Sequence, residues 1–164
     1  MSITLSGDGS ITGLTATGIS AVQNLPAGSV LQVVQGSTTS QTTSSSTSYV
    51  LASNLAATIT PKFSTSKILV LVSTQCSSGN NNIYLYAGIG RNASVVFEGS
   101  VLYTTGAGAA LWTPCVLNYL DSPATTSATT YQLYFKNGGG SAGNVQIGWS
   151  SPITSTITLM EIAA

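Results

Sequence analysis

The sequence predicts an all-β protein: an antiparallel, jelly-roll-like β-sandwich preceded by an extended N-terminal arm. Three observations support this fold class. Short apolar or alternating segments recur from residue 29 onward at intervals of roughly 8–15 residues. Val, Ile, Thr and Tyr dominate them, and Gly, Pro, Asn or Ser bound them. No stretch carries an apolar repeat of helical period and useful length, and 164 residues are enough for one domain with a hydrophobic core.

Residues 1–28 form the expected arm, and residues 29–164 form the expected sandwich. The arm has one charged side chain, Asp8, and its apolar residues are too sparse to build a core. Pro26 and Gly28, within NLPAG, indicate a turn where the arm ends. An extended, uncharged segment can add a strand to the sheet edge of another protein. We therefore expect the apolar residues of the arm to anchor it to a protein partner: Ile3, Leu5, Ile11, Leu14 and Ile19.

After the turn, SVLQVVQG (29–36) is the first predicted strand. The segment STTSQTTSSSTS (37–48) has no apolar anchor, so we expect an exposed, mobile loop. The remaining predicted strands share a short length, turn residues at their ends and β-favouring side chains: YVLA (49–52), LAATIT (55–60), KILVLVSTQC (67–76), NIYLYAGIG (82–90), SVVFEG (94–99), LWTPCVLNYL (111–120), TTYQLYFK (129–136), NVQIGW (144–149) and STITLMEI (155–162).

Two of these segments also predict how they are covered. In TTYQLYFK, residues 131, 133 and 135 are apolar or aromatic while their neighbours are mostly polar, which is typical of a half-buried strand. KILVLV (67–72) is apolar on both faces, so we expect this strand to be covered on both sides. Nine or ten short strands in about 135 residues fit a jelly roll best.

Charged residues make up 5% of the chain, against roughly 25% in ordinary soluble domains. Four basic residues face four acidic ones, there is no His, and 48 of the 164 residues are Ser or Thr. The surface is therefore kept wet mainly by hydroxyls and amides. Low net charge means little mutual repulsion, which suits a particle surface where copies lie side by side. Four scattered cations cannot form a nucleic-acid site, and the longest apolar run, 68–72, is far below the ~20 residues of a membrane span.

The residues that usually carry catalysis are scarce. Without His there is no Ser-His or Cys-His nucleophile and no imidazole metal ligand. Glu98 and Glu161 lie far apart in sequence, and we interpret them as solvated or ion-paired groups rather than a glycosidase pair. Cys76 and Cys115 match no metal-binding spacing; we interpret them as two buried free thiols, with a disulfide as the alternative. We predict no enzymatic activity, no metal and no cofactor.

Two short motifs have structural interpretations. Gly88-Ile-Gly90-Arg-Asn-Ala93 resembles a dinucleotide-binding loop, but a strand follows it where that motif needs a helix. We expect Gly88 and Gly90 to allow close approach of a neighbouring strand or loop. Asn92-Ala-Ser94 matches a glycosylation sequon, and we interpret it as an ordinary polar turn.

Tyr84 and Tyr86 lie two residues apart, on one face of a predicted strand. Three interpretations remain open for this pair. The rings can fill the sandwich core or pack across strands, they can form a subunit interface, or they can serve as a platform for a glycan.

Several stretches of the sequence resemble a family of phage virion structural proteins found in phages of cyanobacteria and other aquatic bacteria. The similar stretches cover the arm, the first strand and much of the remaining chain: SGDGSITGLTATGI, LPAGSVLQVVQG, ITPKFSTSKILVLVS, LDSPATTSATTYQLYFKN and STITLMEIAA. LDSPATTSATTYQLYF is the most specific of them, and residues 76–118 depart from the family pattern.

The resemblance implies a virion component without enzymatic activity, either a capsid decoration (cement) protein or the head of a fibre. For decoration it implies a jelly-roll homotrimer on the capsid surface, assembled in the bacterial host cytoplasm, with the major capsid protein as partner of the arm. The alternative is a short tail or head fibre whose sandwich binds a host-surface glycan. A free carbohydrate-binding module is a third interpretation, against which the arm counts because such a module needs none.

Overall fold

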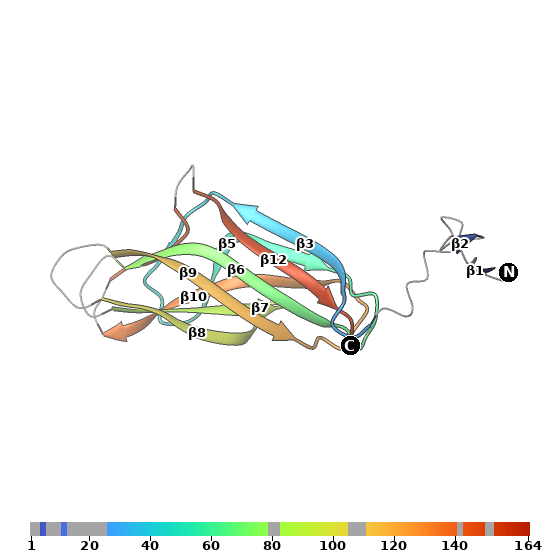
Figure 1. Cartoon of the computed structure of the whole chain (residues 1–164). Helices are drawn as coiled ribbons and strands as arrows, with labels where there is room; N and C mark the ends of the chain where they lie inside the picture. Colours follow the sequence, from blue (N-terminus) through green and yellow to red (C-terminus); the bar gives the residue numbers. More distant parts are fainter. Residues whose placement is uncertain are drawn as a thin grey trace.

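The computed structural model describes residues 4–5, 11–12, 26–78, 83–104, 111–140, 143–149 and 153–164. The described residues between 26 and 164 form two facing antiparallel sheets (Figure 1). Their strands are β3 (Val30–Thr38), β4 (Thr42–Ser44), β5 (Val50–Ile59), β6 (Lys67–Ser78), β7 (Ile83–Arg91), β8 (Ser94–Thr104), β9 (Leu111–Asp121), β10 (Thr129–Gly140), β11 (Val145–Ile147) and β12 (Ser155–Ile162).

The eight long strands have the jelly-roll topology. The large sheet has the order β3-β12-β6-β9, and the small sheet has the order β5-β10-β7-β8. The first and last long strands, β3 and β12, are therefore neighbours, and the chain passes between the sheets from β3 to β5 and from β5 to β6. The short strands β11 and β4 extend the large sheet beyond the end of β12. The predicted fold class, an antiparallel jelly-roll sandwich, is confirmed.

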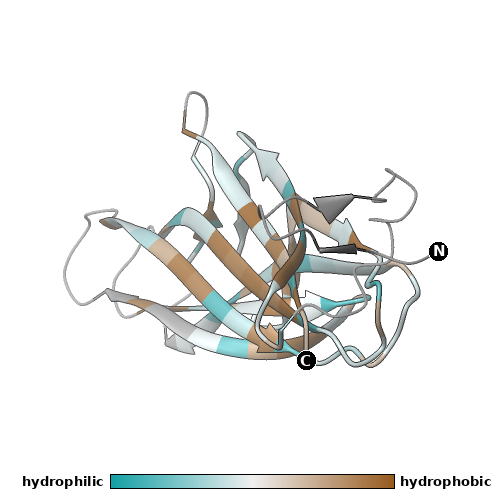
Figure 2. Cartoon of the chain, turned by 45° about the vertical axis from the view of Figure 1, so that its right-hand side comes forward, coloured by the Kyte–Doolittle hydropathy of each residue, from teal (hydrophilic) through white to brown (hydrophobic). Residues whose placement is uncertain are grey.

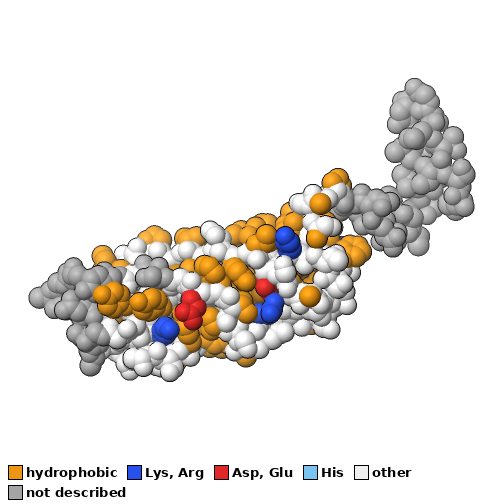
Figure 3. All heavy atoms as spheres, turned by 90° about the horizontal axis from the view of Figure 1, so that it is seen from below, with side chains coloured by type: hydrophobic (Ala, Val, Ile, Leu, Met, Phe, Trp, Pro, Cys, Tyr) orange, Lys and Arg blue, Asp and Glu red, His pale blue; other side chains and the backbone are white. Residues whose placement is uncertain are grey.

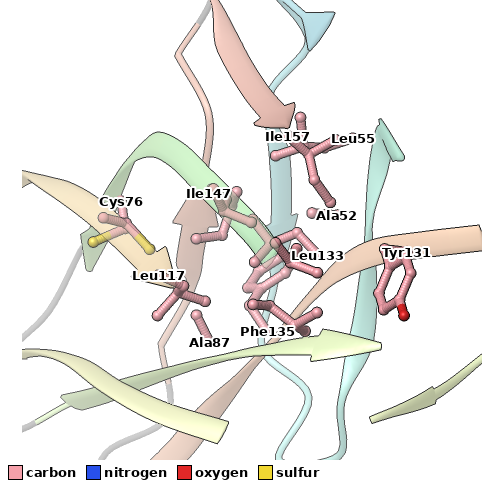
Figure 4. Packing of buried hydrophobic residues seen from close by; sticks show 14 of the residues in the cluster. Ala52, Leu55, Cys76, Ala87, Leu117, Tyr131, Leu133, Phe135, Ile147 and Ile157 are labelled. Atoms are coloured by element: carbon pink, nitrogen blue, oxygen red, sulfur yellow. The ribbon is translucent and has the colours of Figure 1, made fainter. Parts of the chain in front are cut away.

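Alternation of side chains along the strands builds the core between the sheets. Figure 2 shows it as apolar and polar bands that follow each other along the strands. The predicted inward face of 129–136 is confirmed, because Tyr131, Leu133 and Phe135 are fully buried while the residues between them are half-buried. Figure 4 shows Leu133 and Phe135 in the middle of this cluster, which also contains Leu117 and Ile157 from the facing sheet.

Two predictions about the strands were wrong. The expected loop at 37–48 contains β4, whose residues pair with β11, and β3 runs on to Thr38. A backbone ladder needs no apolar anchor, and Thr favours strands, so a hydroxyl-rich segment can pair. The segments 49–52 and 55–60 belong to one strand, β5, whose register shifts around Asn54. Asn54 has φ +65°, a left-handed conformation that Asn tolerates better than most residues.

The expectation that 67–72 is covered on both faces was also wrong. Ile68, Val70 and Val72 are buried in the core, but Leu69 and Leu71 on the opposite face are only half-buried. That face of β6 belongs to the outer surface of the large sheet, and its neighbours there are described below.

The turn at Pro26–Gly28 is confirmed. Ser29 N–H donates to the Pro26 carbonyl, and Gly28 has φ +88°. Gly28 N–H also donates to the Ala163 carbonyl, so the arm leaves the sandwich beside its C-terminus. Within the arm, the described residues form two short strands, β1 (Thr4–Leu5) and β2 (Ile11–Thr12), that pair antiparallel with each other.

Two buried carboxylates tie elements together. Asp121, at the end of β9, accepts two hydrogen bonds from Arg91 Nη1 at 2.8 and 3.0 Å and one from the Tyr131 hydroxyl at 2.6 Å. Because Arg91 and Tyr131 lie on the small sheet, this cluster joins the two sheets. Burial and the Asp121 carboxylate raise the pKa of Tyr131, which keeps its hydroxyl protonated as a donor.

The second carboxylate, Glu161 on β12, is fully buried. It accepts hydrogen bonds from Gln32 Nε2 at 2.6 Å and from the backbone N–H groups of Lys62 and Phe63 at 2.7 and 3.3 Å. It therefore holds the turn between β5 and β6 against the large sheet. Burial alone would raise the pKa of Glu161, but these hydrogen bonds to the charged form outweigh it, and the pKa is lowered.

Replacing Glu161 with Gln should lower the free energy of unfolding by about 1–3 kcal/mol at pH 7, because the new amide NH₂ faces the Gln32 donor. The lowered native pKa means that the contribution of Glu161 is fully present above its ordinary pKa, 4.5, and is lost as the pH falls through the native pKa. Urea unfolding of both proteins across this acid range should show their difference shrinking as the pH falls. A difference that does not change with pH would contradict this account of Glu161.

Candidate interaction surfaces

An aliphatic row crosses the outer face of the large sheet. Met160 on β12 pairs with Val33 on β3 and with Leu69 on β6, and Leu69 pairs with Leu120 on β9. These four side chains point away from the core, and we call them the aliphatic stripe. Val33 is 55% exposed and Leu120 is 48% exposed, while Met160 and Leu69 between them are half-buried. Leu71 and the exposed Val116 extend the apolar surface along β6 and β9.

The rest of this face is nearly uncharged. The row on one side of the stripe combines Leu71 with the polar residues Gln35, Thr158 and Asn118, and Gln35 Nε2 donates to the Thr158 hydroxyl at 2.9 Å. The row on the other side holds Val30, Ile162 and Lys67. Of the residues that the structure describes on the outer faces of β3, β12, β6 and β9, only Lys67, at the start of β6, carries a charge. A partner can therefore cover the stripe without burying an unpaired charge.

The outer face of the small sheet has different chemistry. Four tyrosines from three segments gather there, and we call them the tyrosine layer: Tyr49 before β5, Tyr84 and Tyr86 on β7, and Tyr134 on β10. The rings of Tyr84 and Tyr86 are 6.3 Å apart between centroids and are inclined by 23°. Tyr84 is 37% exposed and the other three are half-buried, so these rings do not belong to the sandwich core.

Glycines make room for the tyrosine layer. A Cβ atom at Gly90 would collide with the ring of Tyr134, and one at Gly138 would collide with the ring of Tyr86. A Cβ atom at Gly88 would lie 2.8 Å from the Phe97 carbonyl oxygen and 3.4 Å from the Tyr49 ring. The close approach expected at Gly88 and Gly90 therefore occurs, but tyrosine rings account for much of it where we expected a strand or loop.

One cation and one anion lie within the tyrosine layer. Lys136 Nζ is 4.2 Å from the centroid of the Tyr49 ring and 5.5 Å from that of Tyr86, both within cation–π range. Burial, followed by the charge of Glu98 on β8, raises the pKa of Tyr49 to about 12, so its phenol stays neutral. Figure 3 shows how sparse the charged side chains are on the face that it displays.

The remaining predicted residues are placed as follows. Leu5 and Ile11 of the arm pair with each other in β1 and β2, while Ile3, Leu14 and Ile19 lie outside the described residues. The 92–93 segment is the hairpin turn between β7 and β8, as the sequon interpretation predicted, with Asn92 at φ +47° and Ala93 at φ +71°. Thr130 N–H donates to the Asn92 side chain.

The fold does not bring Glu98 and Glu161 into one cleft, since Glu98 is exposed on the small sheet and Glu161 is buried on β12 of the large sheet. The interpretation of Glu161 as a solvated or ion-paired group was wrong, because neutral donors, Gln32 and two backbone N–H groups, hold its buried carboxylate. Cys76 and Cys115 are free and buried on the neighbouring strands β6 and β9, as the free-thiol interpretation predicted. The hydrogen bond with the neighbouring Cys76, followed by burial, raises the pKa of Cys115. Within the described ranges no three His, Cys, Asp or Glu residues gather as a metal site requires.

The described part of the chain offers no helix with the length and apolar character needed to cross a bilayer. Sequence reasoning missed a second aromatic contact, in which Trp112 on β9 meets Trp149 edge-on with 3.9 Å between ring centroids. These residues are 37 positions apart, and only the pairing of both β9 and β11 with β6 brings them together.

No protein-family model and no curated protein sequence matches this chain. Among solved structures, it is similar to infectious bursal disease virus of the Gt strain (15% identity, TM-score 0.41), covering 81% of this chain and 38% of that one. It is also similar to the VP2 subviral particle of that virus (15% identity, TM-score 0.40), covering 81% of this chain and 37% of that one. The chain thus spans less than two fifths of either viral chain, and the likeness is one of fold.

Proposed function

We propose that this protein is a phage virion structural protein that decorates the outer capsid as a homotrimer, with the major capsid protein as its partner. The observation that carries the proposal is the aliphatic stripe, a partly exposed and almost uncharged surface of the large sheet. The sequence resemblance to phage virion proteins and the low charge of the whole chain support the same function. Binding many copies would stabilise the shell by mass action against genome pressure and heat.

The arm joins the sandwich next to a strand that carries part of the stripe. The arm joins β3 at Pro26–Gly28, and β3 contributes Val33 to the stripe. A closed trimer needs two different complementary patches on each subunit, whereas the stripe is a single patch, which suits contact with a different protein. We therefore assign the stripe and the arm, with Ile3, Leu5, Ile11, Leu14 and Ile19, to the capsid contact.

Deletion of residues 2–20 tests the role of the arm. The truncated protein should remain a folded trimer, because the sandwich from residue 26 onward holds its own core. It should no longer co-sediment with particles that lack the native protein, whereas the full chain should. Retention of the truncated protein at the full-chain level would contradict an anchoring arm.

The tyrosine layer is the observation that favours the alternative, a short tail or head fibre that binds a host-surface glycan. Both functions use the same arm as a root, so arm deletion does not separate them. The number of copies on the particle does, because a decoration protein follows the number of capsomers and a fibre does not.

A further inference from the structure

The tyrosine layer has features that the stability of the sandwich does not require. Rings that only protected glycines from solvent would lie close against the sheet, as Tyr86 and Tyr134 do. Tyr84 instead exposes 37% of its surface beside Tyr86, and the two rings are inclined by only 23°. Together they form an aromatic surface on the outer face of β7, which we call the platform.

Two charged side chains, Lys136 and Glu98, lie on the same outer face as these rings. Lys136 on β10 pairs with Tyr86 on β7, and its ammonium group lies near the rings of Tyr86 and Tyr49. Glu98 is exposed on β8, opposite Gly88, and its charge acts on Tyr49. The two charges are opposite, so the layer carries no net charge.

We infer that the tyrosine layer binds a neutral saccharide, with the C–H face of a sugar ring on Tyr84 and Tyr86 and its hydroxyls hydrogen-bonded to Lys136 and Glu98. The cores of protein interfaces are depleted of charged residues, whereas here a Lys and a Glu lie among the rings. One cation beside one anion also gives no site for a phosphate backbone. A neutral sugar matches both the rings and the charged side chains of the layer. Its apolar C–H face packs on aromatic rings, and its hydroxyls form hydrogen bonds with charged groups.

The test is binding of the full-length protein to an array of bacterial surface polysaccharides, with calorimetric titration of maltohexaose, cellohexaose and chitohexaose. At least one of these glycans should bind, and Tyr84→Ala should weaken its binding by roughly tenfold or more. Lys136→Met, which keeps the apolar stem over the rings, should weaken it as well. Binding should change little between about 0.05 and 0.5 M NaCl, because the ligand is neutral.

Phe63→Ala is the matched control, because Phe63 is an aromatic residue of similar exposure, 40%, in the turn between β5 and β6. It should leave glycan binding unchanged. Absence of binding to every glycan tested would overturn the inference, and so would equal loss in Tyr84→Ala and Phe63→Ala. Dissociation of the oligomer by Tyr84→Ala would overturn it too, because the layer would then be a contact between copies. None of these outcomes depends on where the protein lies on the particle.

Discussion

Replacing Asp121 with Ala should lower the free energy of unfolding by about 3–5 kcal/mol, the largest loss that we expect from a single substitution in this chain. The Asp121 side chain is only 6% exposed and accepts hydrogen bonds from both Arg91 and Tyr131. Without it, a partly buried guanidinium and a buried hydroxyl lose their shared partner, and the link between the ends of β7, β9 and β10 is broken. Urea denaturation at neutral pH measures the effect.

Tyr131→Phe is the graded comparison for this prediction. It removes one hydrogen bond to the same carboxylate and leaves the ion pair with Arg91, so it should cost roughly 1.5–3 kcal/mol. A loss below about 1 kcal/mol in Asp121→Ala would mean that the cluster behaves like an exposed ion pair and does not hold the sheets together.

The second large effect concerns attachment to the particle. Val33→Ser combined with Leu120→Ser should weaken binding to capsids by roughly 10- to 100-fold, since covering the exposed half of each side chain contributes about 0.8–1.5 kcal/mol. Both side chains are about half-exposed in the isolated subunit, so the fold should tolerate the changes. Co-sedimentation with particles over a range of protein concentrations gives the apparent affinity.

Leu51→Ser is the matched control for the stripe. Leu51 is an aliphatic residue with 40% exposure on the small sheet, outside the stripe. The Leu51→Ser variant should bind particles as tightly as the native protein does. An equal loss of particle binding in the control, or unchanged binding of the double variant, would show that the stripe is not part of the proposed capsid contact. Dissociation of the proposed trimer by the double variant would assign the stripe to subunit contacts instead.

The sequence predicted most strands because their information is local. Alternation in TTYQLYFK and STITLMEI places Tyr131, Leu133, Ile157 and Leu159 on inward faces, and the structure agrees. Glu161 lies on the same inward face of β12, but we interpreted it as solvated or ion-paired, because the donors that allow its burial, Gln32 and Lys62, are distant in sequence. The strand β4 was missed because the pairing of 42–44 depends on β11, about 100 residues later.

The two candidate surfaces could not be predicted because they depend on register between strands that are distant in sequence. Val33 and Leu120 lie in one row only because β12 and β6 fit between their strands. Tyr84 and Tyr86 were recognised as a pair from their spacing. Their meeting with Tyr49 and Lys136, however, requires β10 to lie between β5 and β7. Local patterns therefore predicted the layers of this protein, and the order of the strands determined its surfaces.

The central claim, that this protein decorates a phage capsid, is tested most directly by its molar ratio to the major capsid protein in purified particles. Quantitative mass spectrometry with isotope-labelled peptides of both proteins gives this ratio. We expect a constant ratio that matches the number of capsomers, because every capsomer offers the same site. A small copy number unrelated to capsomers would contradict capsid decoration and indicate a fibre at a vertex or on the tail.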